Sequence, residues 1–459
     1  MKTILSPEKW VLNLYPENED TSYEVSKFII VEEYNDEIIL FHTITWAIYI
    51  LTKKEYNNIT DNEYLKSVKV VLNADIDELS IAEEAYRRRM TKKQLPTYDY
   101  VITYIVFTTT ACNARCDYCY EKGTLNIETM TEKTAEDLIQ FIIKHRYPNG
   151  EINLQWFGGE PLLNTNVIDY ICSRLRELEI PYKSTMISNA YLFNQENINK
   201  AKELWNLKDC QITIDGLFED YNTIKNYVYS DIDAFTTLID NIKNILKDTD
   251  IHIKVRFNIS NDNIFKMYNT ISFLKDEFSD DAKLGKISFY VNELFDIMHD
   301  ESLAIDGFKE ELERITSIAH LNNNNKCDIF TGNNTYKREK IHQMCMAFDG
   351  YALAILPDGT FSPCEHIRHE DIFGNIIEGV QNKTVIEKWQ TFDGDALNYC
   401  REQICPLHPI CPRFYNCPSI IMCNEKNGKK EIRLDKAHKR LVNTYMYYLN
   451  EIEKKKVGN

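Results

Sequence analysis

The stretch Tyr100–Tyr120, YVITYIVFTTTACNARCDYCY, joins an apolar run to a loop that carries three cysteines. Its first part, Tyr100–Thr108, is rich in β-branched and aromatic residues and predicts a buried strand. Cys112, Cys116 and Cys119 follow with the spacing C-x3-C-x2-C. In an open α/β sheet, ligands bind at the carboxyl ends of the strands, which is where this loop begins. The stretch therefore predicts the first strand of such a sheet together with a functional loop.

The composition is that of a globular protein with about two or three domains. The chain has 459 residues, of which 44% are hydrophobic and 27% are charged. Its formal net charge of -17 argues against nucleic acid or an anionic membrane as a partner, because either would require a basic face. Its thirteen cysteines favour metal or redox chemistry over a disulfide framework, because the number is odd and no export signal accompanies them.

Neither a targeting signal nor a membrane span is expected. Residues 1–10, MKTILSPEKW, lack the apolar centre of a signal peptide. The apolar stretch Ile38–Leu51 contains His42, Thr43 and Thr45, and it is too short and too polar to cross a bilayer. We therefore predict a cytoplasmic protein with this stretch in its core.

Residues 96–322 alternate strand and helix patterns six times. The strand candidates are Tyr100–Thr108, Glu151–Phe157, Ser184–Asn189, Gln211–Ile214, His252–Ile259 and Lys286–Val291. Because serial alternation implies parallel strands joined by right-handed crossovers, the predicted fold class is α/β, with a partial (β/α)6 TIM barrel. The first helix is predicted to begin at a capping box formed by Thr129 and Glu132. Its buried face should carry Ala135, Leu138, Ile139, Ile142 and Ile143.

Residues 1–95 predict a small, separate α/β unit. Val25–Glu33 and Glu37–Phe41 have the pattern of a β-hairpin. Helical patterns follow near Trp46 and over Ser80–Met90.

The carboxy-terminal part of the chain has a different pattern. Residues 323–428 are rich in cysteine and proline and lack clear periodicity, which is typical of a small domain stabilised by metal. Residues 429–459 predict a closing helix, roughly Ile432–Lys454.

The loop of three cysteines fits an iron–sulfur cluster by its spacing. Three thiolates can bind three irons of a [4Fe–4S] cube and leave the fourth iron without a protein ligand. A zinc knuckle and plain buried cysteines are the alternatives, although zinc would need a fourth ligand nearby.

This loop, with Tyr118 before its last cysteine, resembles the signature of radical S-adenosylmethionine (SAM) enzymes, and further motifs follow in the family's order. They are Gly158-Gly159-Glu160, Ser188-Asn189, Thr213 to Asp215, and Arg256 on the fifth strand. The resemblance implies that SAM is bound by Tyr118, Gly158, Gly159, Glu160, Ser188, Asn189, Thr213, Asp215 and Arg256. Alternatively, Arg256 forms a structural salt bridge. The chain departs from the family pattern at Ala190, Thr213, Tyr221, Asn222 and Lys225.

Near the other end, Cys345, Gly359 and Cys364 resemble the opening of the SPASM extension of peptide-modifying radical SAM enzymes, with a turn over Leu356–Gly359. The family order implies a first auxiliary [4Fe–4S] cluster on Cys345, Cys364 and Cys417, with Cys327 as a candidate fourth ligand. It implies a second on Cys400, Cys405, Cys411 and Cys423. The spacing within this set differs from the family pattern, and a zinc ribbon is the alternative. Cys172 and Cys210 are predicted to be core residues.

The resemblance also implies a function. One electron from a donor such as flavodoxin or ferredoxin would cleave SAM to a 5′-deoxyadenosyl radical, which takes a hydrogen atom from a ribosomally made precursor peptide. The product would be an oxidative cross-link or a related modification, with Glu365 as the base, unless Glu365 is only a hydrogen-bonded loop residue. Residues 1–95 resemble leader-peptide recognition elements, or else they are a packing extension.

Two other functions remain as alternatives. The first is maturation of sulfatases by formation of formylglycine. The second, more distant, is a non-enzymatic iron–sulfur or zinc protein.

Overall fold

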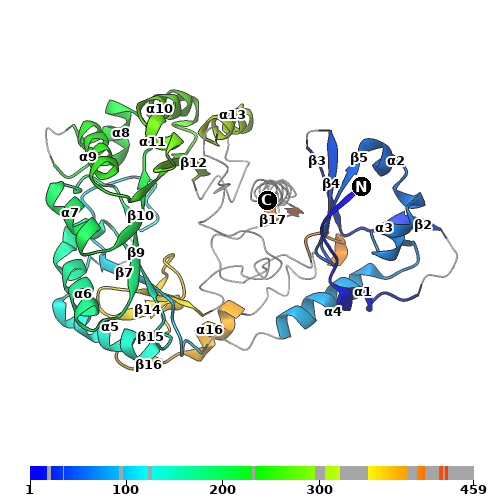
Figure 1. The fold of residues 1–459 in the computed structure, drawn as a ribbon, viewed down its shortest axis with the longest axis horizontal. Helices are drawn as coiled ribbons and strands as arrows, with labels where there is room; N and C mark the ends of the chain where they lie inside the picture. Colours follow the sequence, from blue (N-terminus) through cyan, green and yellow to red (C-terminus); the bar gives the residue numbers. More distant parts are fainter. Residues whose placement is uncertain are drawn as a thin grey trace, which may run out of the picture. The chain divides into compact units, whose positions relative to one another are not determined.

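The computed structural model describes residues 1–17, 22–34, 36–91, 97–121, 127–229, 233–294, 305–320, 350–390, 401–408, 423–426 and 429–432 (Figure 1). The described parts of Met1–Leu95 and Trp389–Asn459 belong to one compact unit. Those of Pro96–Lys326 and Cys345–Lys388 belong to a second unit. Each unit is described by itself below.

The second unit is built on a sheet of six parallel strands in serial order. These are β7 (Thr103–Thr109), β8 (Ile152–Gly158), β9 (Tyr182–Ser188), β10 (Leu207–Thr213), β11 (His252–Ile259) and β12 (Ile287–Glu293). Every neighbouring pair is parallel, so the six predicted strands and their α/β class are confirmed. Closure into a partial barrel stays a prediction. Parallel strands bring the loops that follow them to the same edge of the sheet.

Helices cover one face of this sheet (Figure 1). They are α5 (Glu132–His145), α6 (Thr165–Glu177), α7 (Gln195–Glu203), α8 (Phe218–Lys225), α9 (Ala234–Asp248), α10 (Ile264–Glu277), α11 (Ser279–Lys283) and α13 (Phe308–His320), with the short 3-10 turn η2 (Pro161–Asn164). Along β8 and β9 buried residues alternate with partly exposed ones. That alternation is expected when one face is packed under helices and the other is left partly open.

Helix α5 begins two residues later than the predicted capping box. Its N-cap is Thr131, whose hydroxyl accepts a hydrogen bond from the backbone N–H of Thr134 at 3.1 Å. Thr129 is still extended and pairs with Thr109, so the helix cannot start there. The predicted buried face holds except for Ile143, which is 42% exposed at the edge of the apolar stripe.

The segment after residue 350 continues the same sheet. Strand β13 (Ala352–Ile355) pairs in parallel with β7, and β14 (Thr360–Ser362), β15 (Gly374–Asn375) and β16 (Gly379–Val380) follow in antiparallel order. The predicted turn at Leu356–Gly359 is present, with Gly359 at φ +88°. Two short helical segments, η4 (His369–Asp371) and α16 (Lys383–Gln390), complete the unit.

The first unit contains a four-stranded antiparallel sheet in the order β1-β5-β4-β3. Its strands are β1 (Lys2–Leu5), β3 (Ile29–Tyr34), β4 (Glu37–His42) and β5 (Ala47–Thr52), and a separate pair joins β2 (Tyr23–Val25) to β6 (Val71–Asn73). Its helices are α1 (Lys9–Leu12), α2 (Lys53–Asn57), η1 (Ile59–Asp61), α3 (Glu63–Ser67) and α4 (Glu78–Thr91). The predicted β3–β4 hairpin and the helix over Ser80–Met90 are therefore confirmed, with shifted bounds.

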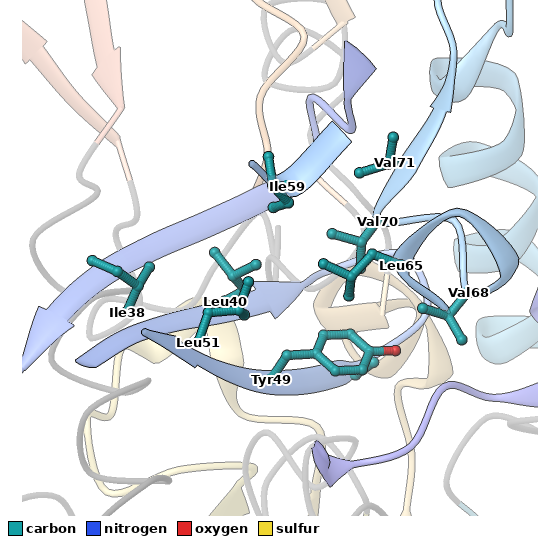
Figure 2. Close-up of a cluster of buried hydrophobic side chains, with 10 residues drawn as sticks. Ile38, Leu40, Tyr49, Leu51, Ile59, Leu65, Val68, Val70 and Val71 are labelled. Carbon is teal, nitrogen blue, oxygen red and sulfur yellow. The ribbon is translucent and has the colours of Figure 1, made fainter. Parts of the chain in front are cut away.

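The helix predicted near Trp46 is wrong. Ala47–Thr52 is the central strand β5, and Trp46 precedes it in a turn at φ +60°. The first five residues of β5 are all buried, so the strand lacks the alternation that would distinguish it from a helix. Figure 2 shows the core beneath the sheet, where Leu40, Tyr49 and Leu51 pack with Leu65 and Val70.

The end of the chain is described only in part. Strands β17 (Cys423–Lys426) and β18 (Lys429–Ile432) form a hairpin, so residues 429–432 are extended and not helical. The rest of the predicted closing helix lies outside the described residues. In the part of the chain that the structure describes, no helix is long and apolar enough to cross a bilayer.

Candidate functional site

The cysteine loop begins where β7 ends, as predicted. Cys112 and Cys116 are partly buried and Cys119 is exposed. The loop is fixed to the segment that ends α8, because Arg115 N donates to Lys225 O at 2.8 Å and Val228 N donates to Asn113 O at 2.9 Å. The loop is thus attached to the end of α8 and the segment after it, as well as to its own strand.

The three thiols suit iron chemically. Burial, helped by the charges of Glu160, Cys116 and Cys119, raises the pKa of the Cys112 thiol to about 12, so the protonated form of Cys112 is favoured until a metal binds. Within the described ranges, no three His, Cys, Asp or Glu side chains already converge as a metal site. Three soft sulfur donors on one partly exposed loop nevertheless fit an iron–sulfur cluster that binds as the thiols lose their protons.

The two predicted glycines lie at the end of β8. A Cβ atom on Gly158, which has φ +117°, would lie 2.1 Å from Thr109 O. A Cβ atom on Gly159 would lie 2.4 Å from Ala111 O. Both glycines therefore allow the end of β8 to contact the start of the cysteine loop, and their predicted contact with SAM stays a prediction.

Glu160 is fully buried and joins the ends of two strands. One carboxylate oxygen accepts hydrogen bonds from Ser188 Oγ at 2.8 Å and Leu162 N at 3.1 Å, and the other accepts from Asn189 N at 2.8 Å. Burial raises the pKa of Glu160 to about 7, against the lowering effect of these bonds. Asn189 Nδ2 in turn donates to Asn113 Oδ1 at 2.6 Å. Three predicted motifs are therefore joined in one network.

Tyr118 and Asp215 also meet, through a residue whose role the sequence did not predict. Lys225 Nζ lies 2.7 Å from Asp215 Oδ2 and donates to the Tyr118 hydroxyl at 2.9 Å, and that hydroxyl donates to the same Oδ2. Burial raises the pKa of Tyr118 well above its ordinary value, so its hydroxyl stays a donor. Burial lowers the pKa of Lys225, but neighbouring groups, the Asp215 carboxylate first among them, outweigh that effect and raise it, which keeps the ammonium charged.

Two buried polar atoms in this region have no hydrogen-bond partner among the described residues. They are the acceptor Asp215 Oδ1 and the donor Asn113 Nδ2. Buried polar groups are nearly always satisfied in folded proteins, so each of these atoms requires an explanation such as a ligand or a water. The only sequence signal for Asn113 is its position inside the cysteine loop.

Thr213 and Arg256 are neighbours on adjacent strands, in register across β10 and β11. Arg256 Nε donates to Asn258 Oδ1 at 2.8 Å. No carboxylate in the described part of the chain lies within ion-pair distance of Arg256, so the alternative of a structural salt bridge finds no support there.

Glu365 follows Cys364 after β14, and the Cys364 thiol lies 3.4 Å from Glu365 Oε2. The ring of His366 lies 4.8 Å from that of Tyr120, the residue after Cys119. Burial lowers the pKa of His366, with Glu365 raising it and Arg256 lowering it. The residue after the predicted base therefore contacts the residue after Cys119, and Tyr120 and His366 are candidate site residues that sequence reasoning did not propose.

The other predicted ligands are placed only in part. Cys405 is buried in the first unit, whereas Cys364 belongs to the second. Cys327, Cys345, Cys400, Cys411 and Cys417 lie outside the described residues, as does the side chain of Cys423. Cys172 and Cys210 are fully buried in α6 and β10, as predicted for core residues.

The sequence matches the family described as a 4Fe-4S single cluster domain over residues 102–232. An uncharacterized protein of Methanocaldococcus jannaschii is 36% identical over 117 residues, 25% of this chain and 38% of that protein. The radical SAM cyclopropyl synthase TigE of Paramaledivibacter caminithermalis is 24% identical over 239 residues, 48% of each chain. GTP 3',8-cyclase of Helicobacter pylori is 27% identical over 217 residues, 47% of this chain and 62% of that enzyme. The chain thus spans about half the length of these relatives.

Among solved structures, native anSMEcpe with bound AdoMet and the Cp18Cys peptide has a TM-score of 0.53 at 12% identity. The match covers 77% of this chain and 99% of that chain, and it shows a shared fold. The 4Fe-4S family match covers the cysteine loop and TigE is a radical SAM enzyme, so these findings confirm the resemblance to radical SAM enzymes that the motifs predict.

Proposed function

We propose that this chain, a radical SAM enzyme by its motifs and relatives, modifies a ribosomally made precursor peptide by hydrogen abstraction and oxidative cross-linking or a related change. One observation carries the proposal. The cysteine loop is joined by hydrogen bonds to the ends of two strands that carry other family motifs, through Asn189 after β9 and Asp215 after β10. A zinc site or an electron carrier would not require that convergence.

A [4Fe–4S] cluster on Cys112, Cys116 and Cys119, with SAM at its open iron, would supply a 5′-deoxyadenosyl radical at this edge of the sheet. The protein's own part is to position the reactants. Glu160 holds the ends of β8 and β9 together, and Asp215 offers a buried acceptor to SAM. Such positioning accounts for a large share of catalysis when the cofactor carries the reactive chemistry.

Glu365 is proposed as the group that takes a proton when the substrate radical is oxidised. Its place beside Cys364, and near Tyr120 through His366, supports this role. The electron would leave through auxiliary clusters, for which the predicted ligands provide two sets in addition to the SAM-binding loop. An external one-electron donor such as flavodoxin or ferredoxin would reduce the SAM-binding cluster.

A peptide substrate is supported by the first unit and by the fold. Among the described residues, β3 (Ile29–Tyr34) pairs only with β4 and forms one end of its sheet. An edge strand can bind an extended peptide by backbone hydrogen bonds, which is the role proposed here for a leader segment. The anSMEcpe structure of similar fold was solved with a peptide bound.

A nucleotide substrate is the competing candidate, because GTP 3',8-cyclase matches 47% of this chain. The test is co-expression of the full chain with a small precursor peptide encoded beside its gene, followed by mass spectrometry. A loss of about two hydrogens from the peptide supports a two-electron modification. An unmodified peptide, together with conversion of GTP by the same reconstituted protein, would contradict the proposal. Formylglycine formation on a sulfatase-derived peptide would instead favour the sulfatase-maturing alternative.

A further inference from the structure

Lys225 is the last residue of α8 and is only 3% exposed. Its ammonium contacts Asp215 Oδ2 at 2.7 Å and the Tyr118 hydroxyl at 2.9 Å. It also lies 5.6 Å from the ring centroid of Tyr118 and 5.8 Å from that of Tyr221. A lysine buried to this degree is costly unless it is paired, and the partners that pair it come from two different loops.

The backbone of the same residue holds the cysteine loop. Lys225 O accepts a hydrogen bond from Arg115 N at 2.8 Å and lies 3.9 Å from Cys116 Sγ. Asn226, in the left-handed conformation at φ +46°, ends the helix and turns the chain, so that Val228 N reaches Asn113 O. The backbone and the side chain of Lys225 thus both bond to the cysteine loop.

The ion pair uses only one of the two oxygens of the Asp215 carboxylate. Lys225 and Tyr118 both bond to Asp215 Oδ2, and Oδ1 has no partner among the residues that the structure describes. The orphan donor Asn113 Nδ2 belongs to the cysteine loop that Lys225 holds. A buried acceptor and a buried donor are complementary to a molecule that carries both an ammonium group and a carboxylate.

We infer that Lys225 is a positioning residue that couples SAM binding to the cysteine loop. Its ammonium holds the Asp215 carboxylate in place with Oδ1 available to the amino-acid end of SAM, and its carbonyl holds the loop that carries Cys116 and Asn113. The inference rests on the proposed function. It assigns to Asn113 a contact with SAM, and it assigns no contact between Lys225 and SAM.

The test compares variants of the full chain after anaerobic reconstitution. Lys225→Met removes the ammonium and keeps the carbonyl. Asp215→Asn/Lys225→Met also removes the carboxylate that would otherwise be buried without a counter-charge, and it guards against simple misfolding. Lys225→Arg restores a cation. The matched control is Lys266→Met. Lys266, on α10, forms an exposed ion pair at 2.7 Å with Asp220 of α8, the helix that also carries Lys225.

Iron content, the SAM dissociation constant and the electron paramagnetic resonance change of the reduced cluster on SAM addition are measured for each variant. We expect the double variant to keep the iron content and thermal stability of the unmodified chain. It should bind SAM about tenfold to a hundredfold more weakly, with a reduced spectral change. Lys225→Arg should recover part of the affinity, and Lys266→Met should stay within about twofold of the unmodified chain.

Unchanged SAM affinity in Lys225→Met, at unchanged iron content, would overturn the inference whatever the affinity of the double variant. Recovery of full affinity in the double variant would also overturn it, because Lys225 would then serve only to neutralise a buried carboxylate. If the unmodified chain assembles a cluster but neither binds nor cleaves SAM, the proposed function itself fails, which is a separate result.

Discussion

Each of the two compact units contains a buried ion pair, and the carboxylate of the pair in the first unit, Glu8, has no buried oxygen without a partner among the described residues. Arg89 Nη2 lies 2.6 Å from Glu8 Oε2 and also donates to Ile44 O. The guanidinium carbon lies 4.2 Å from the ring centroid of Trp46. Such a pair joins the start of the unit to helix α4, and its role is to hold elements together.

The pair in the second unit is built differently. Lys225 and Tyr118 both contact Asp215 Oδ2, and Asp215 Oδ1 has no hydrogen-bond partner among the described residues. A buried carboxylate oxygen without a partner indicates a place for a ligand, and of the two pairs only that of the second unit has one among the described residues. We therefore expect the first pair to matter for stability and the second for ligand binding.

The largest effect is expected from the cysteine loop, which lies beside the Lys225–Asp215 pair. The triple variant Cys112→Ala/Cys116→Ala/Cys119→Ala should lose SAM cleavage entirely, because no iron is left to transfer an electron to SAM. Iron content should fall by about four atoms. Retained release of 5′-deoxyadenosine would refute the assignment of this loop.

The next largest effect should come from the Arg89–Glu8 pair of the first unit. Arg89→Met leaves Glu8 without its partner inside the first unit and should lower the free energy of unfolding of that unit by about 3–5 kcal/mol. Hydrogen exchange of peptides from β4 and β5 measures this loss locally. Lys53→Met breaks an exposed pair with Glu33 in the same unit and should cost less than about 1 kcal/mol.

The two ion pairs should also differ in their effect on SAM binding. Arg89→Met should leave the SAM dissociation constant unchanged, unlike the Lys225 variants. A large loss of SAM affinity in Arg89→Met would break the distinction between the two pairs.

A further effect concerns Gly158, where the end of β8 closely approaches Thr109 before the cysteine loop. Gly158→Ala places a methyl group 2.1 Å from Thr109 O at a backbone φ of +117° and should destabilise the second unit by about 2–3 kcal/mol. Gly285→Ala has φ +71° and no atom within 4 Å of the new Cβ, so it should cost only about 1 kcal/mol. Equal unfolding midpoints for the two variants would show that the close approach at Gly158 is not limiting.

The smallest effect is a difference in pH response between the units. Burial lowers the pKa of His42 to about 4, so the stability that His42 contributes is complete above about pH 6.5 and is lost as pH falls toward 4. Burial raises the pKa of Glu160 to about 7, so its contribution is complete below about pH 4.5 and is lost as pH rises toward 7. Each change is at most about 3 kcal/mol.

Hydrogen exchange between pH 4.5 and 6.5, on the chain without SAM, checks this prediction after correction for the intrinsic exchange rate. Peptides from β4 should gain protection as pH rises, and peptides from β8 and β9 should lose it. His42→Gln and Glu160→Gln should flatten the two slopes separately. Parallel slopes in both units would contradict the assignment.

The parallel strands of the second unit could be predicted from sequence because their apolar runs alternate with helical patterns. The strand β5 could not, because it is buried along nearly its whole length and has no period of two. The start of α5 was misplaced because Thr129 has the capping-box pattern with Glu132 and Thr131 does not, and only the pairing of Thr129 with Thr109 excludes Thr129 as the N-cap.

Prediction of the candidate site from the sequence was limited in a similar way. Cysteine spacing and short motifs predicted which loops matter, since each motif is local in the sequence. The partners within the site are not local, because Lys225 and Tyr118 are 107 residues apart and Asn189 and Asn113 are 76 apart. Lys225 was visible only as a departure from a family pattern, and its role follows from the contacts that the fold creates.

The central claim is that the cysteine loop and the Asp215 region form one site that binds and cleaves SAM. The most direct measurement is release of 5′-deoxyadenosine from the reconstituted chain after addition of SAM and a low-potential reductant under anaerobic conditions. The account predicts release that depends on reduction and on Cys112, Cys116 and Cys119. A chain that carries its iron, is fully reduced and leaves SAM intact would contradict it.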